Sequence, residues 1–274
     1  MSPLLGVDVL VIVTTALEAS GELIERAKAI AAQLEAPFAL REQKSLDTLR
    51  REYDRDQFLI VKKNRLVLRM GDEEFFFHPN MAVHRVRALK RRQAVPLVEA
   101  LDIRSGDYIL DCTIGLGSDA IVAACAAGTT GKVTGIEHSS LIALIVREGL
   151  RSTKEKLEPD VIAAMGRIEV VQGDHRHILR EFPDNSFDSV YFDPMFRNPQ
   201  KNSDGIAGIR SLADLKPLEP AVIEEACRVA RRRVVMKERS NSDEWYRLQP
   251  DQVLAGKYAS VGYGIWYVGG EDRG

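Results

Sequence analysis

The sequence predicts an α/β protein in which a small α+β unit precedes a doubly wound, mostly parallel sheet. Two observations support this prediction. Residues 58–77 contain short apolar runs separated by "KKN" and "GD", which is typical of a β-meander with tight turns. From residue 108 onward, apolar runs alternate with stretches of helical spacing. That alternation indicates βαβ units and therefore parallel strands.

The composition is that of an ordinary globular chain. Its 274 residues are 45% hydrophobic and 28% charged, so a full core can form without disulfides or metals. The net charge of −2 excludes a globally basic nucleic-acid binder but not a local basic patch. No apolar run reaches the roughly 18 residues of a membrane span, and we expect no secretion signal, because no basic segment followed by a cleavage site is seen near the first residues. We therefore expect a cytoplasmic protein.

The three cysteines, Cys112, Cys125 and Cys227, are widely spaced and odd in number. We expect reduced core residues, not metal ligands or nucleophiles, because cytoplasmic thiols stay reduced and buried cysteines behave as small apolar groups. His84 and His177 also lack any partner at a metal-binding spacing. We expect no metal site.

The first unit is predicted to span residues 1–77. The β-branched run at 6–15 predicts a buried strand. Ser20 is a candidate N-cap for an amphipathic helix that stops before Pro37, and a second helix is expected from Ser45. The meander of residues 58–77 then completes the unit.

A second, larger unit is predicted at residues 94–274, after a basic linker at 78–93, "HPNMAVHRVRALKRRQ". Helices are expected between its successive strands, which makes the sheet doubly wound. A final pair of strands closes the chain. The expected strands are 108–112, 132–137, 167–172, 187–192 and 233–237, with the closing pair near 252–255 and 260–268.

The strongest local signal is "YILDCTIGLGSDAIVAACAAG", residues 108–128. A strand ends in Asp111, the turn carries Gly115 and Gly117, and a helix opens at Ser118 and Asp119. Glycine allows a sharp turn and close approach of a ligand, and the helix N-terminus presents free N–H groups. Taken alone, such a turn is often only a tight connection.

Acidic residues follow four successive strands of the predicted sheet, which strengthens this interpretation. They are Asp111, Glu137, Asp174 and Asp193. Glu137 ends the second strand, where an acidic side chain binds the hydroxyls of a ribose in nucleotide sites, although a surface glutamate is the plain alternative. Asp174 would then reach the adenine of the same nucleoside. Carboxylates aligned at strand ends indicate a ligand crevice.

The glycine turn distinguishes between two classes of nucleotide ligand. A dinucleotide site has a third glycine that helps to hold a pyrophosphate, whereas here Gly117 is followed by Ser118, Asp119 and Ala120. The negative charge of Asp119 would repel a phosphate. An acidic site suits a ligand with adenosine and positive charge, as in S-adenosylmethionine. The sequence therefore favours a class I methyltransferase over a dehydrogenase.

The segments "LDCTIGLGSDA", "GIEHS", "QGDHR" and "YFDPMF" together resemble the J-type family of ribosomal small-subunit RNA guanine-N2 methyltransferases and their Gram-positive relatives. The resemblance covers roughly residues 58–274. It implies a Rossmann-like seven-stranded class I methyltransferase domain behind the small α+β domain. By this likeness the S-adenosylmethionine pocket would be lined by Ser118, Asp119, Glu137, His138, Asp174, His175 and Asp193.

The segment "YFDPMFRNPQKN" (191–202) is the candidate site of methyl transfer. An exocyclic amine is a weak nucleophile, and acceptors at its two N–H bonds would help to aim its lone pair. Asp193 offers a carboxylate, and Pro194 a carbonyl held in place by the fixed φ of proline. Phe196 could stack on a flipped base. The plain alternatives are a strand cap for Asp193 and a hydrophobic plug for Phe196.

Two basic clusters favour a nucleic-acid substrate over a small amine, although such clusters are often only solvated faces. One follows the aromatic ring of the candidate site and the other fills the linker. Phosphate contacts there would make binding sensitive to salt. The residues concerned are Arg197 and Lys201, and Arg85, Arg87, Lys90, Arg91 and Arg92.

The expected function is methyl transfer from S-adenosylmethionine to an exocyclic amine of structured RNA, with guanine N2 of 16S ribosomal RNA implied by the resemblance. The expected partner is ribosomal RNA or the small ribosomal subunit, without a membrane or a metal. Two alternatives stay open. One is a methyltransferase acting on a small molecule or protein, and the other is a non-catalytic RNA-binding assembly factor.

Overall fold

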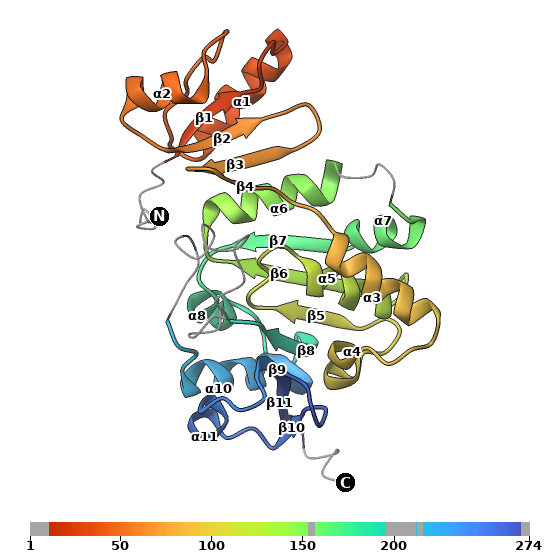
Figure 1. Ribbon diagram of the computed structural model, residues 1–274. Helices are drawn as coiled ribbons and strands as arrows, with labels where there is room; N and C mark the ends of the chain where they lie inside the picture. The colour runs from red at the N-terminus through yellow and green to blue at the C-terminus, as the bar shows by residue number, and fades with distance from the viewer. Residues whose placement is uncertain (1–10, 153–156, 195–211, 213–215, 270–274) are drawn as a thin grey trace.

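The computed structural model describes residues 11–152, 157–194, 212 and 216–269, which form two β-sheets (Figure 1). The smaller sheet has the order β1-β2-β3-β4, with β1 and β2 parallel and the other pairs antiparallel. Helices α1 and α2 follow β1 along the chain. Their bounds are β1 Ile12–Thr15, α1 Gly21–Gln33, α2 Leu46–Tyr53, β2 Gln57–Val61, β3 Leu66–Met70 and β4 Glu73–Phe75.

The expected helix starts of this unit are confirmed by their caps. The Ser20 side chain accepts a hydrogen bond from the N–H of Leu23, and that of Ser45 accepts one from the N–H of Thr48. Each cap satisfies a backbone donor that the first helical turn leaves unpaired. The strand expected at 6–15 is described only from Ile12 onward, because residues 1–10 lie outside the described part of the chain.

The segment expected only as a basic linker contains a helix, α3 (Asn80–Lys90). Ala82 and Val86 are buried, and α3 packs against α5 (Ser118–Ala126). The many charges hide the pattern, since apolar side chains occupy only one narrow face of this helix. α3 is therefore part of the folded body of the protein.

The larger sheet has seven strands in the order β10-β11-β9-β8-β5-β6-β7. β5 to β9 are parallel, and β11 runs antiparallel to both β9 and β10. All the expected strands are confirmed within a few residues at their ends. Their bounds are β5 Tyr108–Asp111, β6 Lys132–Glu137, β7 Ile168–Gln172, β8 Phe187–Phe192, β9 Ala230–Arg239, β10 Gln252–Leu254 and β11 Val261–Tyr267.

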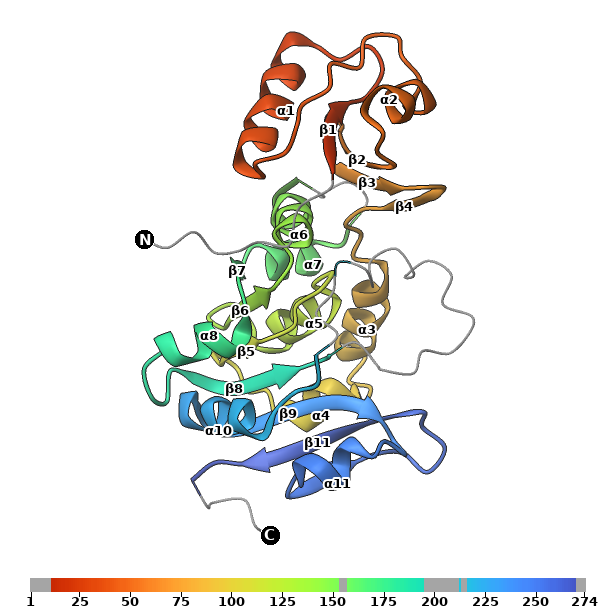
Figure 2. The same ribbon diagram turned by 90° about the vertical axis from the view of Figure 1, so that its left-hand side faces the viewer.

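Helices cover both faces of this sheet (Figure 2). Successive side chains of β8 point to opposite faces, so Val190 joins the core on one side and Tyr191 the core on the other. The Tyr191 face carries α4 (Pro96–Leu101), α5, α6 (Ser140–Ser152) and α7 (Pro159–Met165). The opposite face carries α8 (His175–Ile178), the 3₁₀ turn Leu179–Glu181, α10 (Pro220–Val229) and α11 (Glu244–Leu248).

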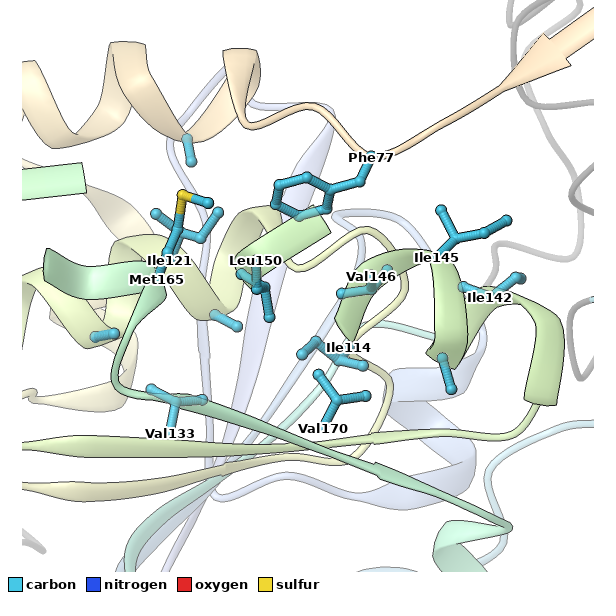
Figure 3. Packing of buried hydrophobic residues seen from close by; sticks show 14 of the residues in the cluster. Phe77, Ile114, Ile121, Val133, Ile142, Ile145, Val146, Leu150, Met165 and Val170 are labelled. Atoms are coloured by element: carbon cyan, nitrogen blue, oxygen red, sulfur yellow. The ribbon is translucent and has the colours of Figure 1, made fainter. Parts of the chain in front are cut away.

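The small sheet lies on helix α6 of the larger unit (Figure 1). Phe77 points onto this helix above Val146 and Leu150 (Figure 3), where a Cβ on Gly149 would come within 2.2 Å of the ring. Arg26 of α1 forms an ion pair of 2.6 Å with Glu148. Apolar packing and a charged contact therefore join the two units.

Among the helices of the described residues, none has both the length and the apolar character that crossing a membrane requires.

Candidate active site

The glycine turn after β5 forms the base of the site. Gly115 has φ +49° and Gly117 has φ +72°, values in the left-handed region that side-chain-bearing residues adopt at a cost. Gly117 is also the N-cap of α5, which places the first turn of that helix directly after the strand. The turn therefore presents backbone N–H groups at the carboxyl edge of the sheet, as the sequence predicts.

Glu137 ends β6 and contacts this turn. Its Oε2 accepts a hydrogen bond of 3.2 Å from the N–H of Gly115, and its Oε1 accepts one of 2.9 Å from the N–H of Ser139. Burial raises the pKa of Glu137 to about 7, although these backbone donors oppose the rise. A carboxylate can accept about four hydrogen bonds, so both oxygens keep lone pairs for the hydroxyls of a ribose.

His138 follows directly and carries a buried Nδ1 atom that lacks a hydrogen-bond partner among the described residues. Buried polar atoms are nearly always paired, so this nitrogen fits a position against a bound polar group. Together with the acceptors of Glu137 and the glycine turn, it fits the nucleoside of S-adenosylmethionine.

Asp193 and Lys237 meet at the centre of the carboxyl edge. Strands β8 and β9 are parallel, with Tyr191 beside Val235, so two residues further along Asp193 comes beside Lys237. Lys237 Nζ lies 2.7 Å from Asp193 Oδ2. Burial raises the pKa of Asp193 to about 6, whereas the ammonium of Lys237 opposes that rise.

Asp119, on the first turn of α5, receives three donors from three other elements. The phenol of Tyr191 donates to its Oδ2 at 2.7 Å, Lys237 Nζ lies 3.4 Å from the same oxygen, and Arg85 Nη1 lies 2.5 Å from Oδ1. Burial alone would raise the pKa of Asp119, but Lys237 and Arg85 lower it. Asp119 is therefore ionised in the folded protein at neutral pH.

Asp111 lies beneath this group and is buried. Its Oδ1 accepts a hydrogen bond of 3.0 Å from the N–H of Thr113, and burial raises its pKa well above the ordinary value. Thr113 in turn accepts a bond of 2.6 Å at Oγ1 from the backbone N–H of Asp193. The first and fourth acidic strand ends are thus connected through one threonine.

The third strand end has a different environment. Asp174 caps α8 by accepting from the N–H of Arg176 and also pairs with its guanidinium at 2.7 Å. Burial acts to raise its pKa, but the hydrogen bonds from Arg176 lower it to about 2. His175 packs edge-on against Phe192, with ring centroids 5.7 Å apart. Asp174 and His175 lie at the expected carboxyl edge of the sheet. The partner of Asp174 is the guanidinium of Arg176, two residues further along the chain.

The basic cluster on α3 divides into three groups. Arg85 differs from the expected outward phosphate contact, because it points to the glycine turn, where it also donates to Ser118 Oγ at 3.2 Å. Arg87 and Lys90 lie on the surface in ion pairs with Glu158 and Asp160. Arg91 and Arg92 are exposed beyond the end of the helix. Phe196, Arg197 and Lys201, also expected at the site, lie outside the described residues, as does Met195.

Sequence reasoning missed several residues of the site. Tyr191 and Tyr263 look like ordinary core residues of their strands, and Thr113 looks like part of a turn. Lys237, by contrast, ends the fifth predicted strand, a position from which the sequence allows it to approach the substrate. The alternation of strand side chains is a usable signal, because Tyr191 and Asp193 are two residues apart and share one face.

The family comparison decides the class of this site. A family model described as "Putative SAM-dependent methyltransferase" matches residues 39–261, which is more than half of the chain. The protein belongs to this family. It is accordingly an enzyme that uses S-adenosylmethionine as its cofactor. Glu137, His138 and the glycine turn are residues of this methyltransferase that fit the nucleoside part of that cofactor.

Three relatives of the methyltransferase match it over different shares of its length. A Bacillus subtilis protein, "Uncharacterized protein YpiP", is 39% identical over 92% of this chain and 98% of its own length. "Ribosomal RNA small subunit methyltransferase J" of Thioalkalivibrio sulfidiphilus is 27% identical over 87% of this chain and 92% of its length. The protein of that name from Alteromonas mediterranea aligns over 59% of this chain and 62% of its own length.

A solved structure has the same fold. The crystal structure of a SAM-dependent methyltransferase from Neisseria gonorrhoeae matches with a TM-score of 0.63 at 19% identity, over 96% of this chain and 98% of that chain. The match extends over both sheets, so the small N-terminal sheet is part of the shared architecture. The class I, Rossmann-like fold expected from the sequence is confirmed.

Two further features concern the cysteines and metal ligands. All three cysteines are free thiols, and burial raises the pKa of Cys112 well above its ordinary value. Within the described ranges of the chain, no group of three or more His, Cys, Asp or Glu side chains is arranged to hold a metal.

Proposed function

We propose that this enzyme methylates the exocyclic N2 amine of a guanine in 16S ribosomal RNA. The observation that carries the proposal is the position of Asp193 directly after β8, where its backbone N–H donates to Thr113 Oγ1 beside the glycine turn. Asp193 has a carboxylate as an acceptor, and Pro194, the next residue, has a backbone carbonyl. These two acceptors at one strand end suit an NH2 group, which has two hydrogens to donate.

The chain's own residues have three tasks in this reaction. Glu137 and the glycine turn hold the cofactor, which supplies an activated methyl group when bound. Asp193 and the Pro194 carbonyl accept the two N–H bonds, so that the nitrogen lone pair is aimed at the methyl carbon. Asp193 is also placed to take the proton that the amine loses once it is methylated.

An RNA substrate is supported first by the relatives named ribosomal RNA small subunit methyltransferase J. The second support is the basic surface formed by Arg87, Lys90, Arg91 and Arg92, which suits a phosphate backbone. Lys90 and Arg87 have acidic partners on the surface, and exchange of such exposed pairs for phosphate costs little because they are weak.

The hairpin between β10 and β11 is a third support. Its residues 255–260 lie at the same sheet edge as the ends of β8 and β9 (Figure 2), because Ser240, next to the end of β9, bonds to Ser260. Tyr258 is 90% exposed, and Lys257 Nζ lies 5.5 Å from its ring centroid. An exposed ring beside a cation suits stacking on an unpaired base with a phosphate contact.

The test begins with ribosomal RNA from a strain that lacks the gene. Its methylated nucleosides are compared with wild type, and the RNA or small subunits are then methylated in vitro by wild-type protein and by Asp193→Ala. We expect one missing N2-methylguanosine, restored by wild type and not by the variant. An unchanged nucleoside profile, or full activity of Asp193→Ala, would contradict the proposal.

A further inference from the structure

The contact between Lys237 and Asp193 joins two residues that lie far apart in the sequence. Lys237 is on β9 and Asp193 follows β8, and the parallel register brings them together on the α5 side of the sheet. The distance of 2.7 Å from Nζ to Oδ2 is that of a charge-assisted hydrogen bond. The side chains are 23% and 29% exposed, so solvent screens this pair less than a surface pair.

Asp193 is held from two directions. Its backbone N–H donates to Thr113 Oγ1 at 2.6 Å, which fixes the chain at the strand end. Lys237 holds one of the two carboxylate oxygens, Oδ2. A carboxylate with one oxygen bound in this way has its plane fixed, and Oδ1 remains the oxygen for an N–H donor of the substrate.

We propose that Lys237 is a positioning residue for methyl transfer: it orients the Asp193 carboxylate toward the amine and keeps it in the anionic form that accepts the N–H. This inference rests on the proposed role of Asp193, and it adds a residue to the site of methyl transfer. Lys237 acts through Asp193 and is not proposed to touch the reacting atoms.

The surrounding charges explain why a cation is needed there. Asp119 of α5 disfavours the negative charge of Asp193, while Lys237 of β9 and Arg85 of α3 favour it. Burial, and then the charges of Asp119 and Asp193, raise the pKa of Asp111 of β5. The phenols of Tyr191 on β8 and Tyr263 on β11 have raised pKa values and are neutral. Three carboxyl groups therefore share one pocket, and two like charges close together tend to protonate one of the pair.

The chemical step uses this anion. As the N–C bond forms, the C–S bond of the sulfonium breaks and its electron pair goes to sulfur, giving the neutral thioether product. The amine nitrogen then loses one proton to the Asp193 carboxylate, which releases it to solvent. A protonated Asp193 can neither accept that proton nor accept a hydrogen bond through the protonated oxygen, so the rate should follow the ionised fraction.

The experiment compares Lys237→Met, Lys237→Arg and a control, Lys132→Met. Lys132 is exposed at the start of β6, at the opposite edge of the sheet, and lies 5.7 Å from the ring centroid of Tyr108. The single-turnover rate on 16S RNA is measured from pH 5 to 9, beside binding of S-adenosylhomocysteine by calorimetry. The Asp193 carboxyl is titrated by carbon NMR without substrate, with Asp193→Asn to assign the signal.

We expect Lys237→Met to lower the rate at pH 7 by roughly 10- to 100-fold. The acid limb of the pH–rate profile of this variant should move to higher pH by about one unit or more, because the nearest cation is gone. The titration midpoint of the Asp193 carboxyl should move upward by the same amount. Lys237→Arg should restore most of the rate and most of the wild-type carboxyl titration. Lys132→Met should match wild type in both measurements. Thermal denaturation shows which variants are folded.

A folded Lys237→Met variant with an unchanged rate, or with an unchanged acid limb and carboxyl titration, would overturn the inference, because Lys237 would then not support the reaction or not set the charge of Asp193. Failure of the proposed RNA substrate is distinguishable. In that case wild type does not methylate 16S RNA, whereas the NMR titration still reports whether Lys237 controls Asp193.

Discussion

Arg85 Nη1 lies 2.5 Å from Asp119 Oδ1, and this contact fastens helix α3 to the first turn of α5. The two side chains are 29% and 11% exposed, so the pair is more protected than the surface pairs of the same helix. A residue that the sequence places in a basic linker thus becomes part of the wall of the candidate active site.

Replacing Arg85 by Met should lower the free energy of unfolding by roughly 1–3 kcal/mol at pH 7, because Asp119 loses a partner in a mostly buried position. Arg87→Met is the matched control, since Arg87 pairs with Glu158 on the surface, and it should cost less than about 1 kcal/mol. Chemical denaturation of both variants measures the difference. Equal losses would show that burial of the Asp119 pair has no energetic consequence.

The loss of stability in Arg85→Met should depend on pH, because it arises from the ionised carboxylate of Asp119. Its folded pKa is lowered by Lys237 and Arg85, so its contribution to stability is present above the ordinary carboxyl pKa and is lost as the pH falls through the folded value. The gap between wild type and Arg85→Met should therefore narrow below about pH 4. A gap that widens in acid would contradict this origin.

Cofactor affinity should depend on the ionisation of Glu137. Its pKa is raised to about 7 by burial, so the carboxylate is formed at pH 8 and mostly protonated at pH 6. We expect wild type to bind S-adenosylhomocysteine more tightly at pH 8, since a carboxylate accepts stronger hydrogen bonds from ribose hydroxyls. Glu137→Gln should lose about tenfold in affinity at pH 8 and most of the pH dependence.

Calorimetry at both pH values checks this, with Glu169→Gln, an exposed position on β7, as control. The raised pKa of Glu137 acts in the opposite direction on the stability of the ligand-free protein, which should be greater at low pH. The stability from Glu137 is fully present below the ordinary carboxyl pKa and is lost as the pH rises through about 7. A wild-type affinity that is constant from pH 6 to 8 would exclude a role for this carboxylate.

Gly149 determines whether the small sheet can dock on α6. A Cβ there would come within 2.2 Å of Phe77, whereas at Gly166 the nearest atom to a Cβ is 3.6 Å away. Gly149→Ala should destabilise the protein by roughly 1–3 kcal/mol through overpacking, and Gly166→Ala should be close to neutral. Thermal melts compare the two. If Gly149→Ala destabilised the Phe77→Ala variant as much as it destabilises wild type, the clash would not be its cause.

The exposed ring of Tyr258 should affect RNA binding without affecting the cofactor. Tyr258→Ala should raise the KM for RNA on the order of tenfold, with kcat and the salt dependence of KM little changed. Lys257→Ala should instead reduce the salt dependence of KM. Tyr108→Ala is the control, because Tyr108 and Lys132 form a similar pair at the opposite sheet edge. Equal KM values for both tyrosine variants would remove the hairpin from the RNA surface.

The sequence by itself determined the strands, the glycine turn and the row of acidic strand ends, because these follow from local patterns of apolar, turn-forming and charged residues. Ser20 and Ser45 gave the two N-terminal helix starts in the same way. The carboxyl ends of parallel strands share one edge, so the sequence alone places Asp111, Glu137, Asp174 and Asp193 together.

Only the tertiary structure decided which charges neutralise these carboxylates. Lys237 contacts Asp193 because β8 and β9 pair in one particular register, and Arg85 reaches Asp119 because α3 packs across α5. A shift of one residue in that register would turn Lys237 to the other face of the sheet. Such contacts depend on strand pairing and helix packing between distant segments, which local sequence patterns do not encode.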